Sequence, residues 1–216
     1  STALWLLEPD VAYIFRNGDG VSLLVAMPAK DRLPAFRQDR EAALLALCSD
    51  LPDGPDLSAA QRVSDVIGAT DYPSITRTRI VAPGVALIGD AALVGDPVWG
   101  TGIGWALQSA EWLSDAVAAP VLRGAAGDID AAARRYQRRH RRNLVPHQMM
   151  SIHFSRTRRL DPVQRLLFAG AARDPKVAAA MLAVGRRDRS PFTLAAPATL
   201  LRAVLTARWA PPAVRH

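Results

Sequence analysis

One segment of the chain combines residue types and spacing that suit the binding of a ligand. It starts with an apolar run over 85–88, continues with Gly-Asp-Ala-Ala over 89–92, and then reads Pro-x-x-Gly-x-Gly-x-Gly over 97–104. A short run that is apolar throughout is typical of a strand buried on both faces in a parallel sheet. We therefore expect Asp90 to follow such a strand at its carboxyl end, where open α/β sheets bind their ligands.

The glycines and the segment after them add to this prediction. Glycines let a ligand approach the backbone closely, and the pattern from Trp105 to Val117 predicts a helix. The start of a helix offers unpaired N–H groups and a partial positive charge. These features predict a site for an anionic or carbonyl-rich ligand, with Asp90 accepting a hydrogen bond from a hydroxyl group. Taken alone, an aspartate in this place fits a simple turn cap better than a ligand contact.

The whole segment resembles the second flavin-binding motif of FAD-dependent monooxygenases of the aromatic-hydroxylase type. Geranylgeranyl reductases and flavin-dependent halogenases carry related motifs, in which Gly-Asp-Ala-Ala precedes a proline and Gly-x-Gly. The resemblance implies that Asp90 hydrogen-bonds the ribityl hydroxyls of FAD. It also implies that the backbone after Thr101 faces the flavin pyrimidine and stabilises negative charge on the reduced ring. The implied cofactor-binding residues are Gly89, Asp90, Ala91, Pro97, Gly100, Gly102, Ile103 and Gly104.

Two departures from that pattern concern single residues. Many aromatic hydroxylases have histidine where this chain has Leu93, and asparagine where it has Gly104. The Asp96-Pro97 pair is closer to the reductase and halogenase branch, which weakens the case for hydroxylation of a phenol. A third departure is larger: the family begins with strand, Gly-x-Gly-x-x-Gly and helix, which hold the FAD pyrophosphate, and no such segment occurs in this sequence. We therefore expect the chain to be the C-terminal portion of a flavoprotein, with an N-terminal FAD-binding half or a partner chain supplying the rest.

Composition narrows the class of protein. The 216 residues carry 27 Lys and Arg against 20 Asp and Glu, a formal charge of +7, and half of them are apolar. A sizeable core can therefore form. The single cysteine, Cys48, excludes an intramolecular disulfide and favours a reducing, cytoplasmic setting. No apolar run is long enough to cross a bilayer.

The elements that must position the motif follow from periodicity and turn signals. Apolar runs around an Asn-Gly-Asp-Gly turn predict an antiparallel meander over 3–28, and a strand is expected over 74–79. Helices are predicted over 33–47, 57–67, 105–117, 129–142, 162–172, 175–184 and 197–208. Asp128 is expected to cap the helix over 129–142, and Pro146 to kink or end it. The resulting fold class is α+β.

We divide the chain into three parts on this basis. Residues 1–79 resemble part of a substrate-binding domain, and residues 80–118 resemble the second half of an FAD-binding domain. Residues 119–216 are expected to form a helical C-terminal region. The partial flavoprotein would thus combine antiparallel strands, one strand of a Rossmann-like parallel sheet, and helices.

Other kinds of site have weaker support. The arginine-rich segment 134–142 could bind nucleic acid, but we favour the interpretation that it is a solvated helix face. His140, His147 and His153 share no helix face and have no cysteine or acidic partner spaced for zinc, so we expect no metal. A Gly-x-Ser-x-Gly elbow is absent. The amphipathic segment 197–209 suits core packing better than a membrane surface.

The function expected from the resemblance is that of an FAD-dependent oxidoreductase. Our first hypothesis is a monooxygenase that uses NAD(P)H and oxygen on a hydrophobic organic substrate. A flavin-dependent halogenase, a double-bond reductase and an inactive flavin-fold subunit stay open as alternatives. Trp99 and Trp105 fit either the core or the substrate side of the flavin. No side chain is an evident acid or base, so we assign no catalytic residue.

Overall fold

The computed structural model describes residues 2–208, which form helices and small antiparallel sheets, in agreement with the α+β class. They group into two compact units. Among the described residues, the N-terminal unit comprises 2–72 with 157–159, and the C-terminal unit comprises 73–156 with 160–208. The division follows Tyr72 instead of residue 79, and the segments 80–118 and 119–216 fall within one unit.

The predicted meander is confirmed in the N-terminal unit. Strands β1 (Ala3–Leu6), β2 (Val11–Arg16) and β3 (Ser22–Met27) form an antiparallel sheet in the order β1-β2-β3. The turn between β2 and β3 uses Asp19 at φ +59° and Gly20 at φ +74°. Aspartate and glycine tolerate this left-handed conformation better than other residues, which is why the turn was recognisable in the sequence.

Two helices, α1 (Leu33–Gln38) and α2 (Arg40–Ser49), stand where one was predicted over 33–47. Asp39 separates them with an extended backbone (φ −147°), and its carboxylate accepts a hydrogen bond from the Ala42 N–H at 2.9 Å. This cap stabilises the start of α2 and so compensates for the interruption of the helix at Asp39. The core of the unit joins sheet and helices and consists of Ala12, Leu47, Cys48 and Leu51 with the side chains around them.

The helix predicted over 57–67 is wrong, because this segment is irregular in the structure. Its apolar residues Val63 and Ile67 are 73% and 87% exposed, so the apparent apolar stripe has no core to cover. The Asp56 carboxylate accepts from the Ser58 N–H at 2.9 Å, a local turn that competes with helix formation.

The expected parallel strand over 85–88 is also wrong. Instead, β5 (Val81–Ala82) and β6 (Val85–Ala86) form a short antiparallel hairpin. The Pro83-Gly84 turn, with Gly84 at φ +72°, folds the chain back on itself. Val85 is 54% exposed, so this strand is not buried on both faces. A second two-stranded pairing joins β4 (Ile75–Thr76) to β7 (Leu93–Val94), a shorter strand than the one expected over 74–79.

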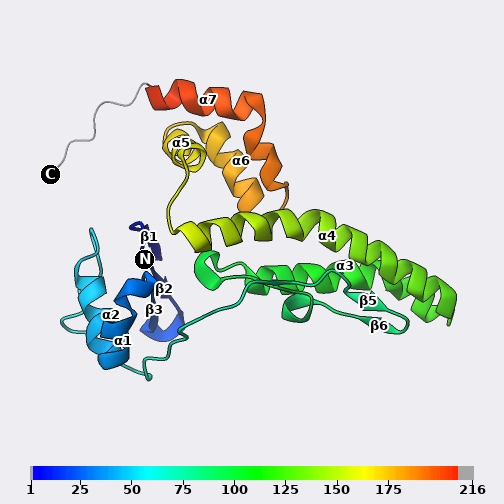
Figure 1. Cartoon of the computed structure of the whole chain (residues 1–216), viewed down its shortest axis with the longest axis horizontal. Helices are drawn as coiled ribbons and strands as arrows, with labels where there is room; N and C mark the ends of the chain where they lie inside the picture. The colour runs from blue at the N-terminus through cyan, green and yellow to red at the C-terminus, as the bar shows by residue number, and fades with distance from the viewer. Residues whose placement is uncertain (1, 209–216) are drawn as a thin grey trace. The chain divides into compact units, whose positions relative to one another are not determined.

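Two long helices, α3 (Gly102–Leu122) and α4 (Ala126–Thr157), lie side by side in the C-terminal unit (Figure 1). Helix α4 exceeds the predicted 129–142 and continues through Pro146, since buried residues on both sides of the proline keep it packed. Asp128 lies in its first turn instead of capping it. The shared core consists of Ile80, Ala92, Leu93, Trp105, Trp112, Tyr136 and Leu144.

The last three helices, α5 (Pro162–Ala171), α6 (Pro175–Gly185) and α7 (Pro197–Arg208), confirm the predictions to within a residue at each end. Asp161 and Asp174 cap α5 and α6, each followed by a proline at the first helical position. The Asp174 carboxylate also pairs with Arg202 of α7 at 2.8 Å. Within residues 2–208, no helix has both the length and the apolar character needed to cross a bilayer.

His140 makes the stability of the C-terminal unit sensitive to acid. Its ring is 2% exposed, lies edge-on to Tyr136 at 5.7 Å, and burial lowers its pKa from 6.5 to about 4. A histidine that is neutral when folded but protonates near pH 6.5 when unfolded destabilises the fold as the pH falls through this window. We expect the free energy of unfolding to fall by up to about 3 kcal/mol between pH 6.5 and 4. Urea titrations across this range should show a flatter profile for His140→Leu; an unchanged profile would contradict the assignment.

Candidate functional site

The Gly-Asp-Ala-Ala segment forms a tight turn against the first half of α3. Gly89 has φ +53°, and a Cβ on it would lie 3.1 Å from the Cβ of Ala106. Both the backbone conformation and the close approach therefore favour glycine. The Ser109 hydroxyl, fully buried, accepts a hydrogen bond from the Gly89 N–H at 2.9 Å and donates to the Ala106 carbonyl at 2.8 Å.

Helix α4 holds the other side of the turn. The Tyr136 hydroxyl donates a 2.7 Å hydrogen bond to the carbonyl of Leu87, two residues before Gly89. Burial raises the pKa of Tyr136 to about 12, so this hydroxyl stays protonated near neutral pH and serves as a donor. The Gln137 side chain accepts from the Ile80 N–H at 2.9 Å. These two bonds fix the backbone that presents Asp90.

Asp90 itself is exposed and lies in the short 3₁₀ helix Gly89–Ala91. Next to it, the Arg77 side chain donates a 2.7 Å hydrogen bond to the carbonyl of Ala91, and the Arg77 N–H donates to the carbonyl of Ala92 at 3.2 Å. The carboxylate of Asp90 is thus accessible to a hydroxyl donor, and a guanidinium lies beside the turn. Arg77 was not predicted as a site residue, because nothing in the motif points to it.

The loop before α3 leaves backbone donors free at the start of the helix. Asp96 caps the 3₁₀ helix Pro97–Trp99, and Gly100, at φ +62°, turns the chain into α3. Helix α3 begins at Gly102, three residues earlier than predicted, with no capping bond from the Thr101 side chain and no acidic residue in its first turn. The N–H groups at the start of this helix therefore have no partner within it. A Cβ on Gly100 or Gly102 would meet no atom within 4 Å.

The predicted residues therefore gather around one end of α3. Gly89, Asp90 and Ala91 pack against its first half, while Pro97 and Gly100 precede it and Gly102, Ile103 and Gly104 form its first turn. Ile103 is 80% exposed. The expectation that Asp90 follows a parallel strand is wrong, but Gly89, the residue before it, still packs on the helix that offers the donors.

Arg187, after α6, covers the position of Gly104. A Cβ on Gly104 would lie 2.6 Å from a terminal nitrogen of this guanidinium, which also donates to the Gln108 side chain at 3.2 Å. Arg187 makes no ion pair among the described residues. Burial, and then the charge of Arg187, lowers the pKa of His147, so this buried imidazole is neutral near pH 7 and does not add to the positive charge. A cation beside the positive end of a helix favours an anionic partner.

The two tryptophans of the motif differ in their surroundings. Trp105 is 3% exposed and belongs to the core, where its ring would meet a Cβ on Gly95 at 2.7 Å. Trp99 lies against Phe154 with ring centroids 4.9 Å apart. Both indole N–H groups are buried without an acceptor among the described residues.

The structure gives little support to a nucleic-acid site or a metal site. Tyr136, the one aromatic residue within the arginine-rich segment, is buried and cannot stack on a base. Arg139 pairs with Asp115 at 3.4 Å and covers the ring of Trp112 at 5.0 Å. Across residues 2–208, no group of three His, Cys, Asp or Glu side chains gathers to hold a metal ion.

Comparisons of the chain with protein-family models, with curated proteins and with solved structures find no match.

Proposed function

We propose that this chain carries the isoalloxazine-side half of an FAD site in an oxidoreductase. The observation that carries the proposal is that the turn with the exposed Asp90 packs through Gly89 against α3, whose first turn is uncapped. Gly89 and Ser109 fix this arrangement from one side and Tyr136 from the other. The sequence pattern predicts a site around Asp90 and the start of α3, and the packing of Gly89 on α3 supports it. The residues before the motif form a hairpin instead of the expected parallel strand.

The donors and acceptors present fit a flavin. Asp90 would hold ribityl hydroxyls, and the N–H groups of Gly102, Ile103 and Gly104 would hold the carbonyl-rich pyrimidine edge. The positive charge of Arg187, together with the helix terminus, would favour a negative charge on that edge. When bound, the flavin would supply the redox chemistry with NAD(P)H and oxygen, while the protein supplies binding and electrostatics.

The remaining part of the FAD, its pyrophosphate, requires residues beyond those present here. We propose that a strand–Gly-x-Gly-x-x-Gly–helix unit, in an N-terminal half or in a partner chain, binds it. Exposed apolar side chains around the motif support this proposal, because water-exposed residues of this size in one region often mark a contact surface. They are Val85, Ile88, Ile103 and Leu107, between 39% and 80% exposed.

A hydrophobic organic substrate is supported by the N-terminal unit. The face of its sheet that carries Tyr13 and Phe15 is apolar and aromatic, with these two rings 5.4 Å apart. Leu4, Phe15 and Leu23 on this face are 50%, 39% and 51% exposed. We propose a monooxygenase that acts on a hydrophobic organic substrate; a halogenase or a double-bond reductase stays open as the alternative.

Replacing Asp90 by alanine tests the flavin site. In the native gene product, Asp90→Ala should raise the Kd for FAD about tenfold or more, because hydrogen bonds to a carboxylate are lost. Flavin absorbance and fluorescence titrations on the apoprotein give this value. The matched control is Asp128→Ala, an exposed aspartate of the same unit that lies 3.9 Å from Arg123. Equal affinity of Asp90→Ala and wild type would contradict the role of Asp90, and a native product that binds no flavin would favour an inactive subunit.

A further inference from the structure

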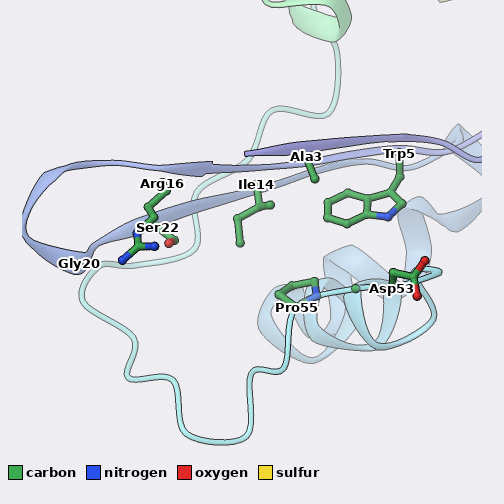
Figure 2. Close-up of a pocket in the computed structure, with 9 residues that line it drawn as sticks. Ala3, Trp5, Ile14, Arg16, Gly20, Ser22, Asp53 and Pro55 are labelled. Carbon is green, nitrogen blue, oxygen red and sulfur yellow. The ribbon is translucent and has the colours of Figure 1, made fainter. Parts of the chain in front are cut away.

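The N-terminal unit contains a cavity that the proposed flavin site does not use. It has a volume of about 360 Å³ and lies on the sheet face that packs on α2, beyond the area that the helix covers. Ile14 forms part of its floor, and the chain at Asp53 and Pro55 forms the opposite wall (Figure 2). Alternation along the strands puts Trp5, Ile14 and Arg16 on this same face.

The wall opposite the sheet is held firmly in place. The indole N–H of Trp5 donates a 2.8 Å hydrogen bond to the carbonyl of Pro52. A Cβ on Gly54 would lie 3.0 Å from the carbonyl oxygens of Cys48 and Leu51, so this segment packs tightly on the end of α2. Asp53 takes the left-handed conformation at φ +50° between them. The cavity therefore lies between the sheet and a segment that packs on the end of α2.

The two ends of the cavity carry opposite charges. Arg16 and Ser22 lie at one end, and Trp5 and Asp53 at the other, with Ile14 and Pro55 between them (Figure 2). Neither Arg16 nor Asp53 forms an ion pair or a side-chain hydrogen bond with any residue in the described part of the chain. Both residues are exposed at the rim of the cavity, and Ile14 and Pro55 offer apolar contact between them.

We propose that this cavity binds a small zwitterion with an amine at one end, an apolar body, and a carboxylate at the other. The guanidinium of Arg16 and the hydroxyl of Ser22 recognise the carboxylate. The carboxylate of Asp53 and the face of Trp5 recognise the ammonium group, combining an ion pair with a cation–π contact. The apolar body lies over Ile14 and Pro55, so the length of the ligand between its two charged groups sets the selectivity.

Binding of ω-amino acids of graded length, from aminobutyrate to aminooctanoate, tests the proposal by isothermal titration calorimetry on the full chain. We expect one chain length to bind best, and the corresponding alkyl carboxylate and alkylamine, which each carry one charge, to bind at least about tenfold more weakly. NMR of the Trp5 indole N–H, assigned through Trp5→Phe, should shift with the same Kd. Failure of every length to bind at millimolar concentration would overturn the proposal.

Two variants separate the ends of the site. Arg16→Gln and Asp53→Asn should each raise the Kd about tenfold or more, and asparagine is chosen because it accepts the left-handed backbone at this position. Arg37→Gln and Asp31→Asn remove exposed charges elsewhere in the same unit and should leave binding unchanged. Thermal unfolding of each variant confirms that it is folded. If Arg16→Gln and Asp53→Asn bind like the wild type, the charged ends are not the recognition groups and the proposal is wrong.

Discussion

Replacing Gly89 by valine is expected to lower the free energy of unfolding of the C-terminal unit by about 2–5 kcal/mol. A β-branched residue is strained at φ +53°, and its Cβ would press on Ala106 at 3.1 Å. Relief requires the turn to move away from α3, which would break the 2.9 Å bond from the Gly89 N–H to Ser109. Urea unfolding followed by circular dichroism measures the loss, and flavin affinity should fall with it.

Gly84→Val is the matched control for this variant. Gly84 lies in the same unit at φ +72°, but a Cβ on it would meet no atom within 4 Å. It therefore carries the backbone strain without the packing conflict. We expect Gly84→Val to be the milder of the two variants and to leave FAD affinity unchanged. Equal destabilisation by both would show that the contact with Ala106 contributes nothing.

Replacing Gln148 by leucine should destabilise the same unit by about 3 kcal/mol. This side chain is fully buried in α4, and its amide donates to the carbonyls of Val94 at 2.6 Å and Ile75 at 3.2 Å. Its carbonyl oxygen accepts from the Thr76 hydroxyl at 2.9 Å. Leucine has a similar volume but removes all three hydrogen bonds, each of which contributes about 1 kcal/mol.

Comparison with Thr76→Val isolates one of these bonds. Thr76→Val removes the hydroxyl that donates to Gln148 but keeps both bonds from its amide, so the expected loss is about 1 kcal/mol. Chemical denaturation of the two single variants and the double variant gives the coupling between them. Additive losses would contradict the idea that Gln148 joins β4 and β7 to α4 as one network.

Sequence patterns predicted the elements whose signals are local. The Asn-Gly-Asp-Gly turn and the Asp-Pro helix starts at 161 and 174 specify their backbone within a few residues, and the meander and helices α5 and α6 follow them. The segments 57–67 and 85–88 were mistaken because an apolar pattern predicts burial, and burial depends on what packs against it. Val63 and Val85 are both more than half exposed.

The candidate site was predictable only in part for a similar reason. The motif from Gly89 to Gly104 is contiguous, so its residues could be named from the sequence. The side chains that hold and charge it, Arg77, Tyr136 and Arg187, come from distant segments with no spacing signal. Tyr136 could be noted only through its place in the helix after the motif, and its bond to Leu87 depends on the packing of α4.

The guanidinium over Gly104 also bears on how this sequence can vary. A side chain at position 104 would displace the guanidinium of Arg187, the far end of a flexible side chain, from the space that it fills. A relative with asparagine at the first position should therefore carry a smaller or differently placed residue at the second. We expect the two positions to covary, and a larger side chain introduced at 104 to be tolerated best when Arg187 is shortened at the same time.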